Sequence, residues 1–268
     1  MLKPLFRFTV GNCLQQGLDV LAESIRITTN TLGIENWDWA ICYNGLSKSD
    51  VDFIQNVIGN RPIDLIDQKW SDCPIEDNIQ SPRRKDGSYE WNGIRCGGTL
   101  WKVCPARMRL DAHEIIMDND IILLRKFHQI DEWLQSNKAL ILEEPIRFYG
   151  RYNHLFPRND SVFLNSGFMG LPPKYDFGAE IRKVWQENGE LKNLSQADEQ
   201  ALLTYTLSLQ QSIRIQKDQM VEVLASDWKT EITGEEQGLH FTQSNRIPNH
   251  RSWKKYLKLR TTQNEGII

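Results

Sequence analysis

Two aspartates one residue apart, Asp118 and Asp120, have the spacing of a metal-binding motif, with Asn119 between them. They follow the apolar stretch 114–117 and precede the apolar stretch 121–124, where a carboxylate needs a compensating charge. Alternate carboxylates at the end of a strand can share one hard divalent cation, and Mg²⁺ or Mn²⁺ is often held by carboxylates together with substrate phosphates. An Asp-Asn-Asp turn is the structural alternative. The position after a buried strand favours the metal site.

The elements before this motif alternate between strand and helix. Apolar periodicity predicts strands at 6–10, 37–43 and 63–66 and helices at 14–32 and 49–57, the second capped by Ser49. A β-α-β-α-β series predicts an α/β fold, with a Rossmann-like, mainly parallel sheet and flanking helices in a single domain. Such sheets bind ligands at the carboxyl ends of their strands, so the metal motif is expected at that edge.

Composition excludes several classes of protein. The chain has 268 residues, 40% of them hydrophobic, which is enough for a sizeable core and excludes disorder for the bulk of it. A net charge of -3 provides no basic field for nucleic acid. No apolar run approaches the roughly 20 residues of a membrane span, although peripheral membrane contact stays open. Five cysteines without a Cys-x-x-Cys pair, and a start without signal-peptide features, predict reduced thiols in a cytoplasmic protein.

Residues 70–91 break the pattern, with proline, glycine and charged residues and no apolar period. Loops beyond about 12 to 15 residues are uncommon unless they are functional or disordered. A flap over the site, spanning 70–96, and a plain surface loop are both compatible with this composition. Residues 97–110 are expected to be helical in parts. The acceptor is expected to meet the segments 70–96 and 145–160.

Five separated motifs resemble nucleotide-sugar glycosyltransferases with the A-type fold, especially the retaining enzymes grouped with glycogenin and lipopolysaccharide galactosyltransferases. Residues 107–110 look like the family's Arg-Leu helix, and 117–120 look like its Asp-x-Asp. Residues 163–170 are similar to its Asn-small-Gly strand. Residues 198–200 look like its acidic helix, and 238–246 look like its closing His-x-x-Gly-x-x-Lys, with Gln243 and Arg246 in place of glycine and lysine.

The resemblance implies a role for each matching residue. Asp118, Asp120 and His240 would hold Mn²⁺ or Mg²⁺, and Arg246 would neutralise the diphosphate. The other nucleotide-binding candidates are Thr9, Val10, Asn12, Tyr43, Arg107, Arg109, Asp118 and Asn119, the first four at strand ends where uracil and ribose would lie. The catalytic candidates are Asp198, Glu199 and Asn165. Residues 1–125 would then form the nucleotide-sugar half, and 126–268 the acceptor-binding and metal-closing half.

Several of these residues have structural alternatives. Ser195-x-x-Asp198 is also a helix-start signature, in which the acid receives amide hydrogen bonds. Residues 165–167 could be a bend with glycine for close backbone approach. His240 could be a packed histidine beside Phe241, and Arg246 a solvated surface residue.

These motifs together predict a metal-dependent hexosyltransferase. It would move a sugar, with retention, from a nucleoside diphosphate sugar, most simply a uridine one, to a hydroxyl on a glycan, lipid or small molecule. One alternative is a sugar nucleotidyltransferase, but residues 10–13 are poor in the glycine and basic residues that a triphosphate loop needs. The other is a non-catalytic carbohydrate-binding domain that uses the 9 tryptophans as a platform.

Overall fold

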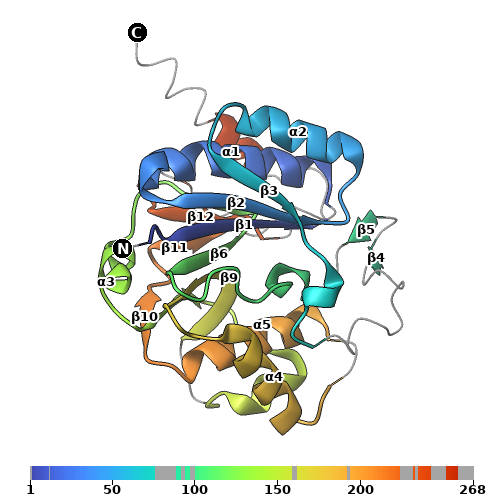
Figure 1. Ribbon diagram of the computed structural model, residues 1–268, viewed down its shortest axis with the longest axis vertical. Helices are drawn as coiled ribbons and strands as arrows, with labels where there is room; N and C mark the ends of the chain where they lie inside the picture. Colours follow the sequence, from blue (N-terminus) through green and yellow to red (C-terminus); the bar gives the residue numbers. More distant parts are fainter. Residues whose placement is uncertain are drawn as a thin grey trace.

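The computed structural model describes residues 2–11, 13–75, 89–91, 94–96, 100–158, 162–191, 194–223, 232, 235–242 and 252–258. Its centre is a seven-stranded sheet (Figure 1), in the spatial order β10 (Ser212–Ile215), β8 (Ala139–Glu144), β9 (Phe163–Leu171), β6 (Glu114–Asp118), β1 (Leu5–Gly11), β2 (Asp38–Asn44) and β3 (Ile63–Asp67). Only β9 runs antiparallel to its neighbours in this sheet. The sheet combines strands from both halves of the chain.

Helices cover both faces of the sheet (Figure 1), with α1 (Gln15–Leu32) and α2 (Lys48–Ile58) on one face and α4 (Phe177–Glu187) and α5 (Gln196–Ser208) on the other. Alternation along β1 explains the first layer, because Phe6, Phe8 and Val10 share a face and pack in one core with Leu18 and Leu21 of α1. A second core joins β9 to α4 and α5 on the opposite face.

The remaining elements are short. β7 (Ile121–Leu123), β11 (Met220–Glu222) and β12 (Gly238–His240) form a three-stranded sheet, and β4 (Tyr89–Trp91) pairs with β5 (Ile94–Cys96). α3 is His128–Leu134, residues 252–258 are helical, and 3-10 turns occupy Ile34–Asn36, Trp70–Asp72, Trp101–Val103 and Gly150–Leu155. No helix within the described ranges has the length and apolar character needed to cross a bilayer.

The structure confirms the predicted fold class and corrects two local details. Ser47, not Ser49, caps α2, because its hydroxyl accepts from the Asp50 amide while the Asp50 carboxylate accepts from the Ser47 amide. In 97–110, the described residues contain only the 3-10 turn Trp101–Val103 as helical structure. Most of the proposed flap at 70–96, including 76–88, lies outside the described residues.

Candidate active site

The carboxyl ends of β1 and β6 bring Thr9 beside Asp118, the first acid of the metal motif. The Thr9 hydroxyl lies 3.1 Å from the Met117 carbonyl oxygen and 3.3 Å from Oδ1 of Asp118, and can donate to either. Val10, the next residue, is fully buried in the core under α1 and α2, so only its backbone can meet a ligand. Tyr43, paired with Val10 at the end of β2, is half-buried.

Lys102 contacts two candidate acids from different elements, Asp118 at the end of β6 and Glu199 in α5. We term the four residues Lys102, Asp118, Ser166 and Glu199 the lysine cluster. Nζ of Lys102 lies 3.1 Å from Oδ2 of Asp118 and 3.2 Å from Oε1 of Glu199. It also donates to the Ser166 hydroxyl at 3.2 Å, and that hydroxyl donates to Glu199 at 3.2 Å. The Lys102 and Glu199 side chains are 8% and 6% exposed, against 27% for Asp118. Asp118 is therefore the acid of the cluster that faces solvent.

The electrostatics of the cluster favour a charged lysine. Burial would lower the pKa of Lys102, but the carboxylates of Asp118 and Glu199 outweigh burial and raise it. Burial raises the pKa of Glu199 to about 7, although the Lys102 charge opposes this shift. The cluster therefore combines a permanent positive charge with a glutamate that exchanges its proton near neutral pH.

The second acid of the motif, Asp120, meets His240. β12 pairs with β7 so that His240 lies opposite Ile121, and the Phe241 amide donates to the Asp120 carbonyl oxygen at 2.8 Å. As a result, Nε2 of His240 lies 3.4 Å from Oδ1 of Asp120, and both side chains are buried. Asn119, the residue between the two aspartates of the motif, is also buried, and its side-chain amide donates to the Gly17 carbonyl oxygen of α1. The Asn119 amide therefore anchors the motif to α1.

The Asp120–His240 pair suits a divalent cation chemically. Oδ1 of Asp120 is buried and accepts no aligned hydrogen bond from the described residues, which is costly for a carboxylate oxygen. Carboxylate and imidazole are both ligands of Mn²⁺. Asp118 is turned toward Lys102, and no three His, Cys, Asp or Glu side chains in the described segments converge as a complete metal site. Binding would therefore require Asp118 to move toward Asp120 and His240.

His240 should make stability fall with rising pH. Burial lowers its pKa, but the Asp120 carboxylate, with Glu222 and Asp118, outweighs burial and raises the pKa to about 9. The folded state thus favours protonated His240, a contribution that is complete below the ordinary value near 6.5 and is lost as pH rises through 9. In chelator, denaturant titrations from pH 6.5 to 9 should show a loss of about 3 kcal/mol in unfolding free energy.

The matched variants are His240→Gln and His154→Gln, since His154 is exposed. The first should flatten the pH dependence and the second should preserve it. An unchanged slope in His240→Gln would contradict the assignment.

Asp198 and Glu199 are adjacent in α5 but have different surroundings. Asp198 completes a capping box with Ser195, accepting from both its amide and its hydroxyl at 2.8 Å. It also pairs with Arg151, and these hydrogen bonds lower its pKa despite burial. Its carboxylate oxygens are thus occupied, which supports the capping alternative, whereas Glu199 belongs to the lysine cluster.

Asn165 and its neighbours lie within β9, where the pairing with β8 changes register between Asn165 and Met169. The Asn165 side chain accepts from the Gly167 amide at 2.5 Å. A Cβ on Gly167 would lie 2.7 Å from Oδ1 of Asn165 and 3.4 Å from Oδ2 of Asp118. The glycine therefore permits the close approach of β9 to the metal motif.

Two arginines predicted to bind nucleotide lie at the other end of the strands. Arg107 donates to the carbonyl oxygens of Arg109 and Ala112, near Glu114 at the start of β6. Arg109 pairs with Asp38 at the start of β2. Asp118 is four positions after Glu114 along β6, about 13 Å at the rise of a strand. The structure therefore places Arg107 and Arg109 away from the lysine cluster, while Asn12 and Arg246 lie outside the described residues.

Sequence reasoning missed Lys102 and Glu144. Glu144 ends β8, is 6% exposed and accepts from Gln200 at 2.7 Å, and burial together with the Glu222 charge raises its pKa to about 7. Both are charged residues in or next to apolar stretches, 100–104 and 139–142. A charged residue in or next to an apolar stretch indicates a buried polar site, because a buried charge needs a partner.

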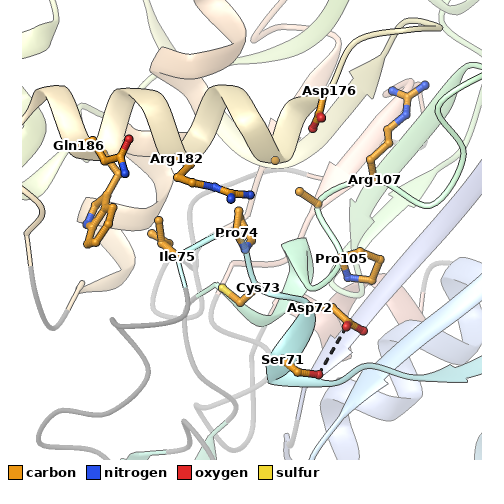
Figure 2. A pocket seen from close by; sticks show the side chains of 13 residues that line it. Ser71, Asp72, Cys73, Pro74, Ile75, Pro105, Arg107, Asp176, Arg182 and Gln186 are labelled. Carbon is orange, nitrogen blue, oxygen red and sulfur yellow. Dashed lines mark hydrogen bonds between the residues drawn. The ribbon is translucent and has the colours of Figure 1, made fainter.

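A separate cavity of about 590 Å³ opens between α4 and the segments 71–75 and 105–107 (Figure 2). Arg182 extends from α4 toward Pro74 in this view, and Trp185 and Gln186 complete the helix side. Of the described residues that line it, none belongs to the lysine cluster or the Asp120–His240 pair.

Comparison with known proteins locates the fold. No protein-family model and no curated protein sequence matches the chain. The galactosyltransferase LgtC, solved with donor and acceptor sugar analogues, superposes with a TM-score of 0.57 at 10% identity, over 96% of this chain and 95% of that one.

Two further glycosyltransferases have a similar arrangement. The bifunctional enzyme WbbM gives a TM-score of 0.59 at 9% identity, over 94% of this chain and 51% of its own. Mouse xyloside xylosyltransferase 1 gives a TM-score of 0.51 at 10% identity, over 91% of this chain and 100% of the xylosyltransferase chain. Likeness at such identities is a likeness of fold. The chain therefore has the A-type fold of the nucleotide-sugar glycosyltransferases.

Proposed function

We propose that this protein is a metal-dependent glycosyltransferase that moves a hexose from a uridine diphosphate sugar to a hydroxyl acceptor. The observation that carries the proposal is the meeting of Lys102, Asp118 and Glu199 at the carboxyl ends of β1 and β6, on a fold shared with glycosyltransferases. This is the edge where parallel α/β sheets bind ligands. Charges of both signs in one largely buried cluster suit a substrate with a diphosphate and a neutral sugar.

The residues of the site would have different roles, which depend on their charge. Asp118, Asp120 and His240 would hold Mn²⁺ or Mg²⁺, which when bound polarises the departing phosphate oxygen. Lys102 adds positive charge next to Asp118, where negative charge develops as the sugar leaves. Glu199 and Asn165 would orient the transferred sugar, and Thr9, Tyr43 and the Val10 backbone would contact the nucleoside. Arg246 would add a further cation to the diphosphate.

Uridine diphosphate and Mn²⁺ should stabilise the protein only together, because each completes the coordination of the other. Thermal unfolding should show a rise in Tm with both that neither produces alone. Asp120→Asn should abolish most of this shift, and Asp131→Asn, an exposed aspartate on α3, should preserve it. Equal stabilisation by the nucleotide in chelator would remove the metal from the proposal.

We expect the product to retain the anomeric configuration of the donor. Inversion needs a carboxylate base within reach of the acceptor hydroxyl. Asp198 is occupied by Ser195 and Arg151, and Glu199 is hydrogen-bonded within the lysine cluster. In a front-side reaction the departing phosphate oxygen accepts the acceptor proton, and the charge of Lys102 stabilises the negative charge that develops on the phosphate as the bond to the sugar breaks. Proton NMR of the first product should show the donor's anomeric coupling, and the inverted coupling would make Glu199 the base.

A further inference from the structure

The turn that opens the 3-10 segment Gly150–Leu155 is joined to the first turn of α5 by Arg151 and Asp198, a contact we term the clamp. The Arg151 amide donates to Oδ1 of Asp198 at 2.7 Å. Its guanidinium donates to Oδ2 through Nε at 3.0 Å and through Nη2 at 2.8 Å. Hydrogen bonds from a charged guanidinium to a carboxylate are stronger than hydrogen bonds between neutral groups.

Gly150 makes the clamp geometrically possible. Its φ is +50°, in the left-handed region that favours glycine. A Cβ at this position would lie 2.4 Å from Oδ1 of Asp198 and 2.9 Å from its amide nitrogen. The neighbouring backbone is helical and cannot easily retreat, so a side chain at 150 is incompatible with the contact.

The clamp acts on the helical turn that carries Glu199. Asp198 also binds Ser195, so one carboxylate joins the cap of α5 to the 150–155 segment. Glu199 is the next residue, and its carboxylate meets Lys102 and Ser166. A rotation of this turn would therefore move Glu199 relative to the lysine cluster.

We propose that Arg151 is a positioning residue, whose clamp on Asp198 fixes the first turn of α5 and so holds Glu199 against Lys102 and Ser166. The inference rests on the proposed function for its catalytic consequence. The Arg151 side chain is 47% exposed, whereas that of Asp198 is 2% exposed. Arg151 can therefore be truncated without opening a cavity in the core.

The test uses the whole 268-residue chain with Mn²⁺ and UDP-glucose or UDP-galactose, measuring release of UDP. Arg151→Ala should lower kcat about tenfold or more, because a small misplacement of a reacting group is costly. UDP affinity should stay within about twofold, since the proposed nucleotide contacts are at β1 and β2, away from Arg151. Arg151→Lys keeps one charged contact and should recover part of kcat. Gly150→Ala should reproduce the loss, and Arg26→Ala, which removes a similarly exposed arginine paired with Glu23 on α1, should match the wild type.

Hydrogen exchange provides a readout that does not depend on turnover. Amides of 196–201 should exchange faster in Arg151→Ala than in the wild type or Arg26→Ala. Unchanged exchange, or wild-type kcat in Arg151→Ala, would overturn the clamp, as would a Tm loss with unchanged kcat per folded molecule. Absence of UDP binding and hydrolysis in the wild type would instead refute the proposed function, and with it the catalytic role of the clamp.

Discussion

Replacing Lys102 with methionine should lower the rate of sugar transfer and of donor hydrolysis by about 100- to 1000-fold, the usual effect of removing one preorganised group that stabilises transition-state charge. The ammonium group lies 3.1 Å from Asp118 and 3.2 Å from Glu199, and its side chain is 8% exposed. Methionine has a similar length and fills the same space without the charge. UDP release under saturating donor and Mn²⁺ measures the effect.

Two controls separate charge from packing in this prediction. Lys102→Arg keeps the charge and should retain more activity than the methionine variant. Lys138→Met removes a half-exposed lysine that pairs with Glu132 across the surface, and should leave activity unchanged. Full activity in Lys102→Met would exclude Lys102 from the reaction.

Glu114→Gln should lower the free energy of unfolding by about 3 to 5 kcal/mol, because it leaves a buried positive charge without its partner. Nη2 of Arg7 lies 3.1 Å from Oε1 of Glu114, and both side chains are 0% exposed. Oε2 of Glu114 also accepts from the amides of Met108 and Arg109, at 2.9 Å and 3.0 Å. Urea unfolding monitored by circular dichroism gives the free energy directly.

The double variant Arg7→Met/Glu114→Met should cost less than Glu114→Gln, because it removes the charge of Arg7 together with its partner, while Arg107 loses its contact with Glu114 in both variants. Lys126→Ala, which breaks an exposed pair with Asp131, should change stability by no more than about 1 kcal/mol. A loss in Glu114→Gln no greater than that in Lys126→Ala would show that the buried pair does not stabilise the sheet.

The sequence by itself determined the strands and helices of the first part of the chain, from β1 to β3, and the end of β6 at which the Asp-x-Asp motif lies. Predicted strands at 6–10 and 37–43 became β1 and β2 with shifts of one residue, because alternation and turn residues act over a few neighbours. The Asp-x-Asp motif was placed correctly at the end of β6 for the same reason. The capping interpretation of Ser195 and Asp198 also depended only on local spacing.

Tertiary structure alone decided the partners of the charged side chains. Lys102 and Glu199 are 97 residues apart in the sequence and meet only because β9 inserts beside β6 and α5 packs over it. Arg107 and Arg109 are of a residue type that suits nucleotide binding, yet they lie at the amino ends of β6 and β2. Residue type determines which chemistry a side chain can perform. Strand order and direction determine which end of the sheet it reaches, and these arise from packing of the whole chain rather than from any local pattern.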